Sequence, residues 1–437
     1  MIPAIIICAV TCLSMIAGVL FFPKIKIGKK FSIDSYWVIT LIGAVILLVS
    51  GQANFSKVIG ALFADTAINP LKILVLFISM TILSIFLDEL GFFRYLASVT
   101  LKRAKNGQMK LFLYLYLMVS VLTVFTSNDI IILSFTPFIC YFAKNAKINP
   151  IPYLAAEFVA ANTWSMALII GNPTNIYLAT AYGVGFLEYV SVMILPTLFA
   201  GVIAFMALLL LFRKKLSTPI EGVAEDVVIE DKLLLWVGIA HLGVCTVLLA
   251  IGSYIQLEMW LVSFISVISL LIFNAVIAIV RKQKPTALFG CIKRGPYQLI
   301  PFILSMFVMI VCLSEKGVTG IIGNFFGAEQ SVLKYGITSF LASNIINNIP
   351  MSVLYSSIIN IETFVTTKAA LPAIYATVVG SNIGAFLTPI GALAGIMWSN
   401  ILNEHGLRFG YVDFLKIGVT VAVPTLLSAL AVLMIIL

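Results

Sequence analysis

The sequence predicts an all-α, polytopic membrane protein with about ten transmembrane helices and two re-entrant hairpins in two inverted-topology repeats. Three observations lead to this fold class: an apolar composition, pairs of short apolar helices that meet at polar tips, and motifs that occur twice. Of the 437 residues, 61% are hydrophobic and 10% are charged, and the mean hydropathy is +1.12. Soluble chains carry about 25% charged residues, so the chain is expected to lie in a membrane.

Ten apolar segments are expected to cross the bilayer, which takes about 20 helical residues. Segments 152–182 and 369–402 are longer than 30 residues, which is expected if each of these helices is broken midway. The predicted spans are 2–22, 35–51, 71–88, 152–182, 188–212, 233–251, 257–280, 296–314, 369–402 and 411–437.

Two further apolar stretches, 111–143 and 331–360, are each divided by a short polar group. Their arms have about 15 residues or fewer, too few to span a bilayer, so each stretch predicts a hairpin that enters and leaves on one side. Backbone at such depth must be satisfied by protein or by a water-filled cavity, which makes each tip a candidate site. The tips are Ser127-Asn128-Asp129 and Asn347-Asn348, with Ser343 and Asn344 one turn before the second.

The motifs of the first half return in the second at matched spacing. Asn128 and Asn162 are 34 residues apart, and Asn347 and Asn382 are 35 apart. This regularity predicts an internal duplication with inverted topology. The predicted units are a first repeat over 1–212, a cytoplasmic linker over 213–232 and a second repeat over 233–437.

The basic residues orient the chain. If the N-terminus lies outside, 22 of the 27 Lys and Arg residues fall in cytoplasmic loops, as the positive-inside rule requires. Both termini are then outside, in a multi-pass protein of the cell (inner or plasma) membrane, and the first hairpin enters from the cytoplasm. The net charge of +9 is therefore assigned to topology, and no nucleic-acid partner is expected.

An inverted repeat brings both hairpin tips and both helix breaks to the bilayer midplane. Asn side chains offer donors and an acceptor to a hydroxylated or hydrated solute, although a single Asn or Ser can also serve as an interhelical hydrogen bond. The candidate substrate- and ion-binding residues are Ser127, Asn128, Asp129, Asn162, Gly171, Asn172, Thr174, Asn175, Ser343, Asn344, Asn347, Asn348, Ser381, Asn382, Thr388 and Gly391.

Asp129 is the one carboxylate in these motifs. A charge at mid-bilayer costs at least ~2.5–3.5 kcal/mol, so Asp129 is a candidate proton carrier or Na⁺ ligand. Glu157 is a second candidate for proton coupling, with a partner role to a loop lysine as the alternative. The motifs contain no Lys or Arg, which favours a neutral or weakly charged solute.

Other chemistry finds little support in the sequence. The six cysteines lack CxxC or Cys/His spacing, so neither a disulfide nor a metal site is expected. There is no HExxH and no histidine paired with a nucleophile, so no catalytic residues, no enzyme activity and no cofactor are expected beyond H⁺ or Na⁺ as coupling ion.

Several motifs together resemble the ArsB-type arsenite and antimonite efflux permeases of the ion transporter superfamily. They are 87–93 (LDELGFF), Asn128-Asp129, 185–189 (GFLEY), 347–350 (NNIP) and 388–391 (TPIG). The resemblance covers the whole chain and implies an elevator-type transporter with a hairpin-containing transport domain. It further implies that neutral As(OH)₃ or Sb(OH)₃ leaves in exchange for H⁺ arriving at Asp129.

Two departures from this pattern keep alternatives open. Residues 171–175 (GNPTN) are closer to the Gly-x-Pro-x-Asn of the carboxylate-carrying branches, and the tips are Ser-Asn-Asp and Asn-Asn rather than Ser-Asn-Thr. The alternatives are a Na⁺- or H⁺-coupled citrate or dicarboxylate transporter and a Na⁺/H⁺ antiporter. The expected partners are the lipid bilayer and a small-molecule or ion substrate, and a homodimer or a soluble ATPase subunit is left open.

Overall fold

The chain folds almost entirely into helices. The computed structural model describes residues 1–27, 31–64, 69–104, 107–217, 227–252, 255, 257–359, 369–407 and 409–437. Within these ranges the one sheet is an antiparallel hairpin of β1 (Lys24–Ile27) and β2 (Phe31–Asp34), which the sequence analysis did not predict. Eight helices of the described part are long and apolar enough to cross a membrane, which confirms the all-α, multi-pass membrane fold.

The described part of the first half contains ten α-helices, and two short 3₁₀ turns interrupt the predicted long span near residue 168. The helices are α1 (Ile2–Phe21), α2 (Ser35–Val49), α3 (Phe55–Phe63), α4 (Pro70–Glu89), α5 (Phe92–Ala104), α6 (Gln108–Phe125), α7 (Asn128–Asn145), α8 (Ile151–Trp164), α9 (Pro173–Ala181) and α10 (Phe186–Phe212). The turns are η1 (Ser165–Ala167) and η2 (Ile169–Gly171).

The second half follows the same order. Its helices in the described ranges are α11 (Lys232–Gly252), α12 (Met259–Val280), α13 (Thr286–Arg294), α14 (Leu299–Glu315), α15 (Val318–Phe326), α16 (Ser331–Ile346), α17 (Asn348–Ile359), α19 (Ala370–Gly384), α20 (Leu393–Glu404) and α21 (Tyr411–Ile436). The helices α6 and α7 have 18 residues each, so the predicted arms of the first hairpin were too short, because the polar residues at their outer ends continue the helices.

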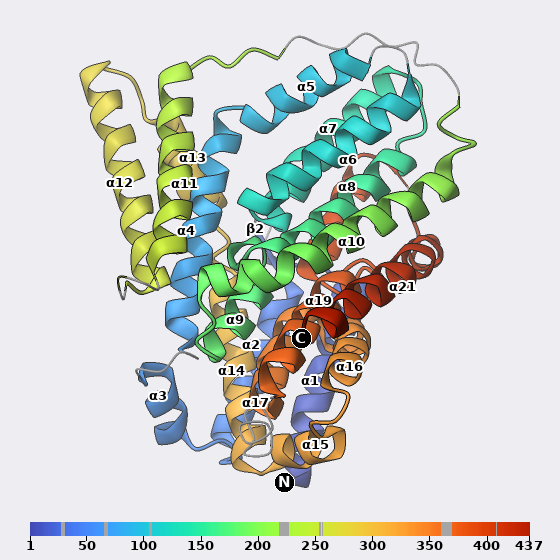
Figure 1. The fold of residues 1–437 in the computed structure, drawn as a ribbon. Coiled ribbons are helices and arrows are strands. Elements are labelled where there is room, and N and C mark those ends of the chain that lie inside the picture. The colour runs from blue at the N-terminus through green and yellow to red at the C-terminus, as the bar shows by residue number, and fades with distance from the viewer. Residues whose placement is uncertain are drawn as a thin grey trace.

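The two halves pack against each other in a reciprocal pattern (Figure 1). The helix α12 packs on α4 of the first half, and α2 packs on α14 of the second. Likewise α20 packs on α7, and α9 packs on α17. Figure 1 shows α4, α11 and α12 side by side, whereas α6, α8 and α10 run obliquely beside one another. The opposite half therefore covers α4 and α14, and it also covers α7 and α17, the second arms of the two hairpins.

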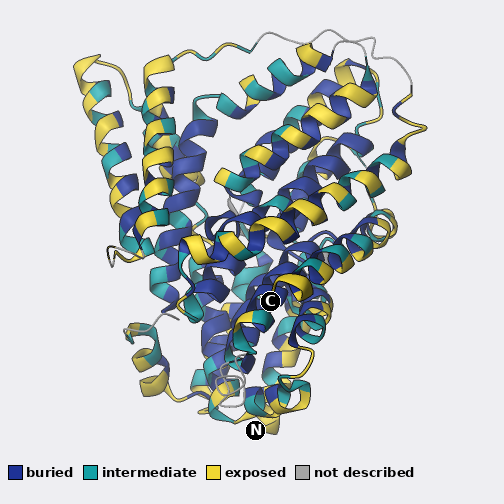
Figure 2. Cartoon of the chain, in the orientation of Figure 1, coloured by how far each residue is buried: buried dark blue, intermediate teal, exposed yellow. Residues whose placement is uncertain are grey.

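The outward faces suit lipid. Figure 2 shows exposed residues along α10, α11 and α12. The exposed side chains of α12 include Ile265, Ile272, Val276 and Ile279. A surface with so many large apolar side chains is unfavourable in water and suits contact with lipid. Large apolar side chains on the perimeter and polar ones in the interior are the arrangement that a bilayer requires.

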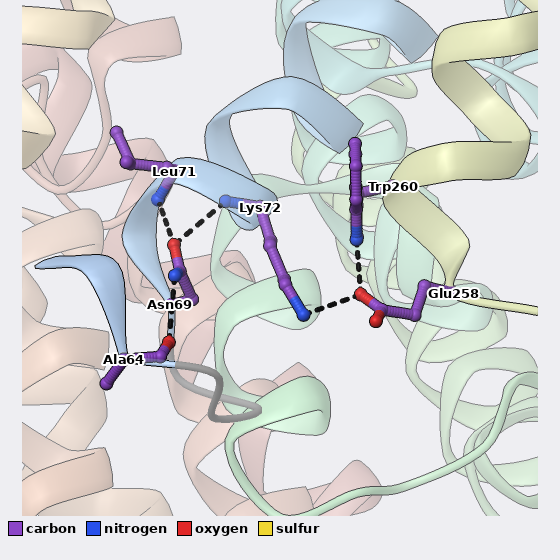
Figure 3. A network of polar contacts seen from close by, with 6 residues as sticks. All are labelled: Ala64, Asn69, Leu71, Lys72, Glu258 and Trp260. Carbon is purple, nitrogen blue, oxygen red and sulfur yellow. Dashed lines mark hydrogen bonds and ion pairs between the residues drawn. The ribbon is translucent and has the colours of Figure 1, made fainter.

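Ion pairs and a capped helix end fix α4 against α12 (Figure 3). The Asn69 side chain accepts hydrogen bonds from the first amides of α4, at Leu71 and Lys72. The Lys72 ammonium lies 2.7 Å from the Glu258 carboxylate, which also accepts a hydrogen bond from the Trp260 indole. Because Glu258 directly precedes α12, this cluster joins one end of the two helices.

The C-terminal ends of α4 and α14 each form ion pairs with a short helix of the other half. Arg294 at the end of α13 lies 2.6 Å from both Asp88 and Glu89 of α4. In the opposite half, Lys57 of α3 lies 3.4 Å from Glu315 of α14. Glu89 and Glu315, the last residues of α4 and α14, thus hold corresponding positions in the two halves.

Small residues allow α16 and α19 to approach each other closely. On α16 the contact is made by Gly336, Ser339 and Ser343, and on α19 by Gly380 and Gly384. A Cβ added at position 380 would lie 2.5 Å from the Gly336 carbonyl oxygen and 2.8 Å from the Phe340 amide nitrogen. Van der Waals contact between small residues is a main source of helix association in membranes.

We expect Gly380→Ala to lower stability by about 1–3 kcal/mol, because its methyl group meets backbone atoms that cannot move aside. Thermal unfolding in detergent would measure this. The matched control is Gly243→Ala on α11, where an added Cβ meets no atom within 4 Å. Equal melting temperatures for the two variants would contradict the packing argument.

Candidate solute-binding site

Asn128, at the tip between α6 and α7, bonds to the broken helix that follows. Its side-chain amide donates to Asn162 Oδ1 at 3.1 Å, and Asn162 Nδ2 donates to the Phe158 carbonyl at 2.8 Å. Ser165 Oγ then donates to the Asn162 carbonyl at 2.8 Å. All three polar residues are buried. The pair that the sequence placed 34 residues apart is thus in direct contact.

Asn382 of α19 joins this network from the second half. Its Oδ1 accepts hydrogen bonds from Ser165 Oγ at 2.9 Å and Asn172 Nδ2 at 3.0 Å. Its Nδ2 donates to Asn175 Oδ1 at 2.7 Å and to the Val378 carbonyl at 2.8 Å. Asn382 therefore links α19 of the second half to the first helix break, and its amide is fully used. Ser165 was not among the predicted site residues, because the end of α8 at Trp164 is visible only in the structure.

The remaining polar residues of the first break hold its backbone in place. Asn172 caps α9 by accepting from the Thr174 amide and hydroxyl, both at 3.1 Å. Asn175 Nδ2 donates to the carbonyls of Ser165 and Leu168. Gly171 is needed because a Cβ there would collide with the Ser165 carbonyl oxygen. These groups satisfy backbone that the interrupted helix leaves unpaired.

A second network surrounds the other tip. Asn344 Nδ2 donates to the Gly384 carbonyl at 3.1 Å, and its Oδ1 accepts from Thr388 Oγ1 at 2.7 Å. Asn347, which adopts a left-handed backbone with φ of 71°, donates to the Ile390 carbonyl at 3.0 Å.

The tip and the second break also meet through backbone alone. The Asn348 amide donates to the Gly391 carbonyl at 3.0 Å. Beside them, Ser343 Oγ donates to the Phe340 carbonyl of its own helix and accepts from Asn344 Nδ2. Every predicted residue of the second half, Ser381 apart, therefore makes a hydrogen bond at or beside the tip or the break.

Among the predicted site residues, four buried side-chain oxygens lack a protein hydrogen bond in the described part of the chain. They are Ser127 Oγ, Asn128 Oδ1, Asn348 Oδ1 and Ser381 Oγ. Each belongs to a side chain that is almost completely buried. Because buried polar atoms in native proteins nearly always find a partner, these oxygens are available to a ligand or to water.

Asp129 faces away from the amide network. It lines a cavity of about 240 Å³ together with residues of α4, α14 and α20, and none of the network amides lines that cavity. The hairpin tip thus separates the predicted carboxylate from the predicted amides, because adjacent residues at a helix N-terminus point about 100° apart.

Glu157 is completely buried on α8. The Thr136 hydroxyl of α7 lies 2.9 Å and 3.1 Å from its two oxygens, and the Trp398 indole of α20 donates to Oε2 at 3.3 Å. Two neutral donors, rather than a loop lysine, surround this carboxylate in the described part of the chain. Neither donor carried a sequence signal, because both lie far from Glu157 along the chain.

The same ranges contain no cluster of three His, Cys, Asp or Glu side chains that could hold a metal ion. The polar interior instead consists of amides, hydroxyls and isolated carboxylates on buried, interrupted helices, which are surrounded by helices with apolar outer faces. Such an interior in a multi-pass protein is typical of a membrane transporter that binds its solute at helix breaks.

Comparison with known proteins agrees with that class. A family model described as citrate transporter (CitMHS) matches residues 31–380. A protein named arsenical pump membrane protein from Escherichia coli is 30% identical over 96% of this chain and 98% of its own length. The chain therefore belongs to the ion transporter superfamily, in the CitMHS family that includes ArsB-type relatives.

Two solved structures are similar in fold. The Alcanivorax borkumensis YdaH transporter superposes with a TM-score of 0.59 at 13% identity, over 99% of this chain and 98% of its own. Neisseria gonorrhoeae MtrF, from a class of antimetabolite efflux pumps, gives 0.53 at 12% identity, over 99% and 94%. Both are transporters, so the shared architecture agrees with the family.

We expect Asn382→Leu to destabilise the protein, because it leaves Ser165, Asn172 and Asn175 each short of a buried partner, at about 1–3 kcal/mol per group. The control is Asn274→Leu on α12, whose buried amide has no partner among the described residues. Thermal unfolding should show a clear loss for the first variant and none for the second. A similar effect of both would contradict the network's structural role.

Proposed function

We propose that this transporter exports a small neutral hydroxylated solute, with arsenite and antimonite as first candidates, by proton-coupled alternating access. The observation that carries the proposal is the set of four buried, unpartnered oxygens at Ser127, Asn128, Asn348 and Ser381. All four can accept hydrogen bonds, and As(OH)₃ or Sb(OH)₃ presents three hydroxyl donors. The absence of Lys and Arg from these motifs favours a neutral solute over an anion.

The names of the relatives add support. The Escherichia coli relative is called an arsenical pump membrane protein, and a Bacillus subtilis relative that is 24% identical is called a putative one. Substrate preference can change at such identity, so the unpartnered oxygens of the site are the main support for this solute.

We further propose that residues 1–212 and 233–437 form two inverted repeats that move as an elevator. The reciprocal packing of α4 with α12 and of α14 with α2 supports a twofold relation between them. The linker 213–232 would lie in the cytoplasm with both termini outside, and its residues 218–226 are outside the described ranges.

Proton coupling is assigned to Asp129 and Glu157. Glu157 accepts hydrogen bonds from α7 and α20 while it sits on α8, so protonation would change contacts among three helices at once. A completely buried carboxylate without a cation is costly in a membrane, and such residues commonly act in proton relays.

A carboxylate transporter is the second candidate function. The description of the family model and the Gly171-Asn172-Pro173-Thr174-Asn175 break favour it. Against it, Arg294, which lines the cavity around Asp129, already pairs with two carboxylates, and this leaves little positive charge for an anionic solute.

Expression in a bacterium that lacks its own arsenite pump should restore arsenite tolerance, and Asp129→Asn should abolish it at equal protein level. The amide cannot carry a proton, while its size is unchanged. Growth on an arsenite series with immunoblotting would measure this. If cells that express the unaltered protein stay as sensitive to arsenite as cells without it, the proposal is refuted. Citrate uptake driven by an imposed gradient would favour the second candidate.

In proteoliposomes a pH gradient should accelerate solute transport by the unaltered protein. In Glu157→Gln this acceleration should be at least about tenfold smaller, because the amide keeps the volume of the side chain but cannot bind a proton. Glu188→Gln, at the exposed start of α10, is the matched control and should retain the response. Full gradient dependence in Glu157→Gln would assign coupling elsewhere.

A further inference from the structure

Two cavities lie next to each other beside the first hairpin tip. The outer one, about 610 Å³, is lined by surface residues such as Tyr141 and His405 and by Val227 at the end of the linker. The inner one, about 240 Å³, is the cavity around Asp129. Leu133 and Arg294 line both, so these two side chains form the boundary between them.

The inner cavity has a polar side built from both halves of the chain. Thr81 of α4, Asp129 of α7 and Asn400 of α20 line it, with Gln298 at the start of α14. Thr81 is 3% exposed, and its hydroxyl has no hydrogen-bond partner among the described residues. A buried, unpartnered hydroxyl beside a carboxylate indicates a site built to bind a polar molecule.

Large apolar side chains form much of the remaining wall, and the inner cavity is small. Phe77 and Ile85 of α4 and Leu393, Ile396 and Met397 of α20 form its walls. Pockets for drug-sized ligands have about 300–1,000 Å³, so 240 Å³ suits a solute with only a few heavy atoms.

The charges around the inner cavity disfavour an anion. The guanidinium of Arg294 is bound to Asp88 and Glu89, both at 2.6 Å, so that cluster carries an excess of negative charge. Asp34 and Asp129 line the cavity itself. A neutral molecule that donates hydrogen bonds therefore fits these walls, whereas an anion does not.

We propose that the inner cavity is a second binding site for the small hydroxylated solute, on the linker side of the hairpin tip and separate from the amide network. Thr81, Asp129 and Asn400 are its polar contacts. The solute reaches it from the outer cavity by passing Arg294 and Leu133. This inference rests on the proposed function, since it takes the same class of solute.

The test is arsenite uptake by everted membrane vesicles, in which the linker side faces the medium. Thr81→Val removes the hydroxyl with little change in shape and should raise KM about tenfold while Vmax stays within about twofold. Asn400→Leu should act in the same direction, and Thr81→Ser should restore KM. The matched control is Thr425→Val on α21, whose buried hydroxyl only donates to the Val421 carbonyl of its own helix.

The outcomes separate the two proposals. An unchanged KM in Thr81→Val, with the melting temperature of the unaltered protein, overturns the second site while arsenite transport stands. A fall in Vmax alone also overturns it, because a site that only supports the fold would give that result. If the unaltered protein moves neither arsenite nor antimonite, the proposed function fails and the second site fails with it.

Discussion

The interior of this protein depends on one constraint: backbone groups freed at a helix break inside a membrane must find hydrogen-bond partners within the protein. Asn side chains meet it, since each supplies donors and an acceptor from one short, uncharged group. Asn175 satisfies two carbonyls at the first break, and Asn344 and Asn347 each satisfy one at the second. Without these amides the interrupted helices could not exist at that depth.

This requirement divides the polar residues into two groups. Asn172, Asn175 and Asn382 use their amides to hold the breaks together, and they leave little capacity for a solute. Asn128 and Asn348 each keep one oxygen unpartnered. A motif that looks uniform in the sequence therefore contains atoms with different tasks, and the hydrogen bonds decide which atom has which task.

The sequence was a good guide where the signal was local. Hydropathy located the helices, and the spacing of Asn128 and Asn162 identified two residues that are in direct contact. It could not locate α3, α13 or the β-hairpin, which are short elements without a long apolar run. It also missed Thr136 and Trp398, because their contact with Glu157 arises from the packing of α7 and α20 on α8.

The reciprocal burial of α4 by α12 and of α14 by α2 constrains the order of biosynthesis. When the ribosome has completed the first half, α4 still lacks the neighbour that will cover it, although most of its residues are buried in the finished protein. The nascent half must wait in the lipid until nearly 70 further residues have been added and α12 (Met259–Val280) has inserted. Assembly is thus a late event that engages both halves together.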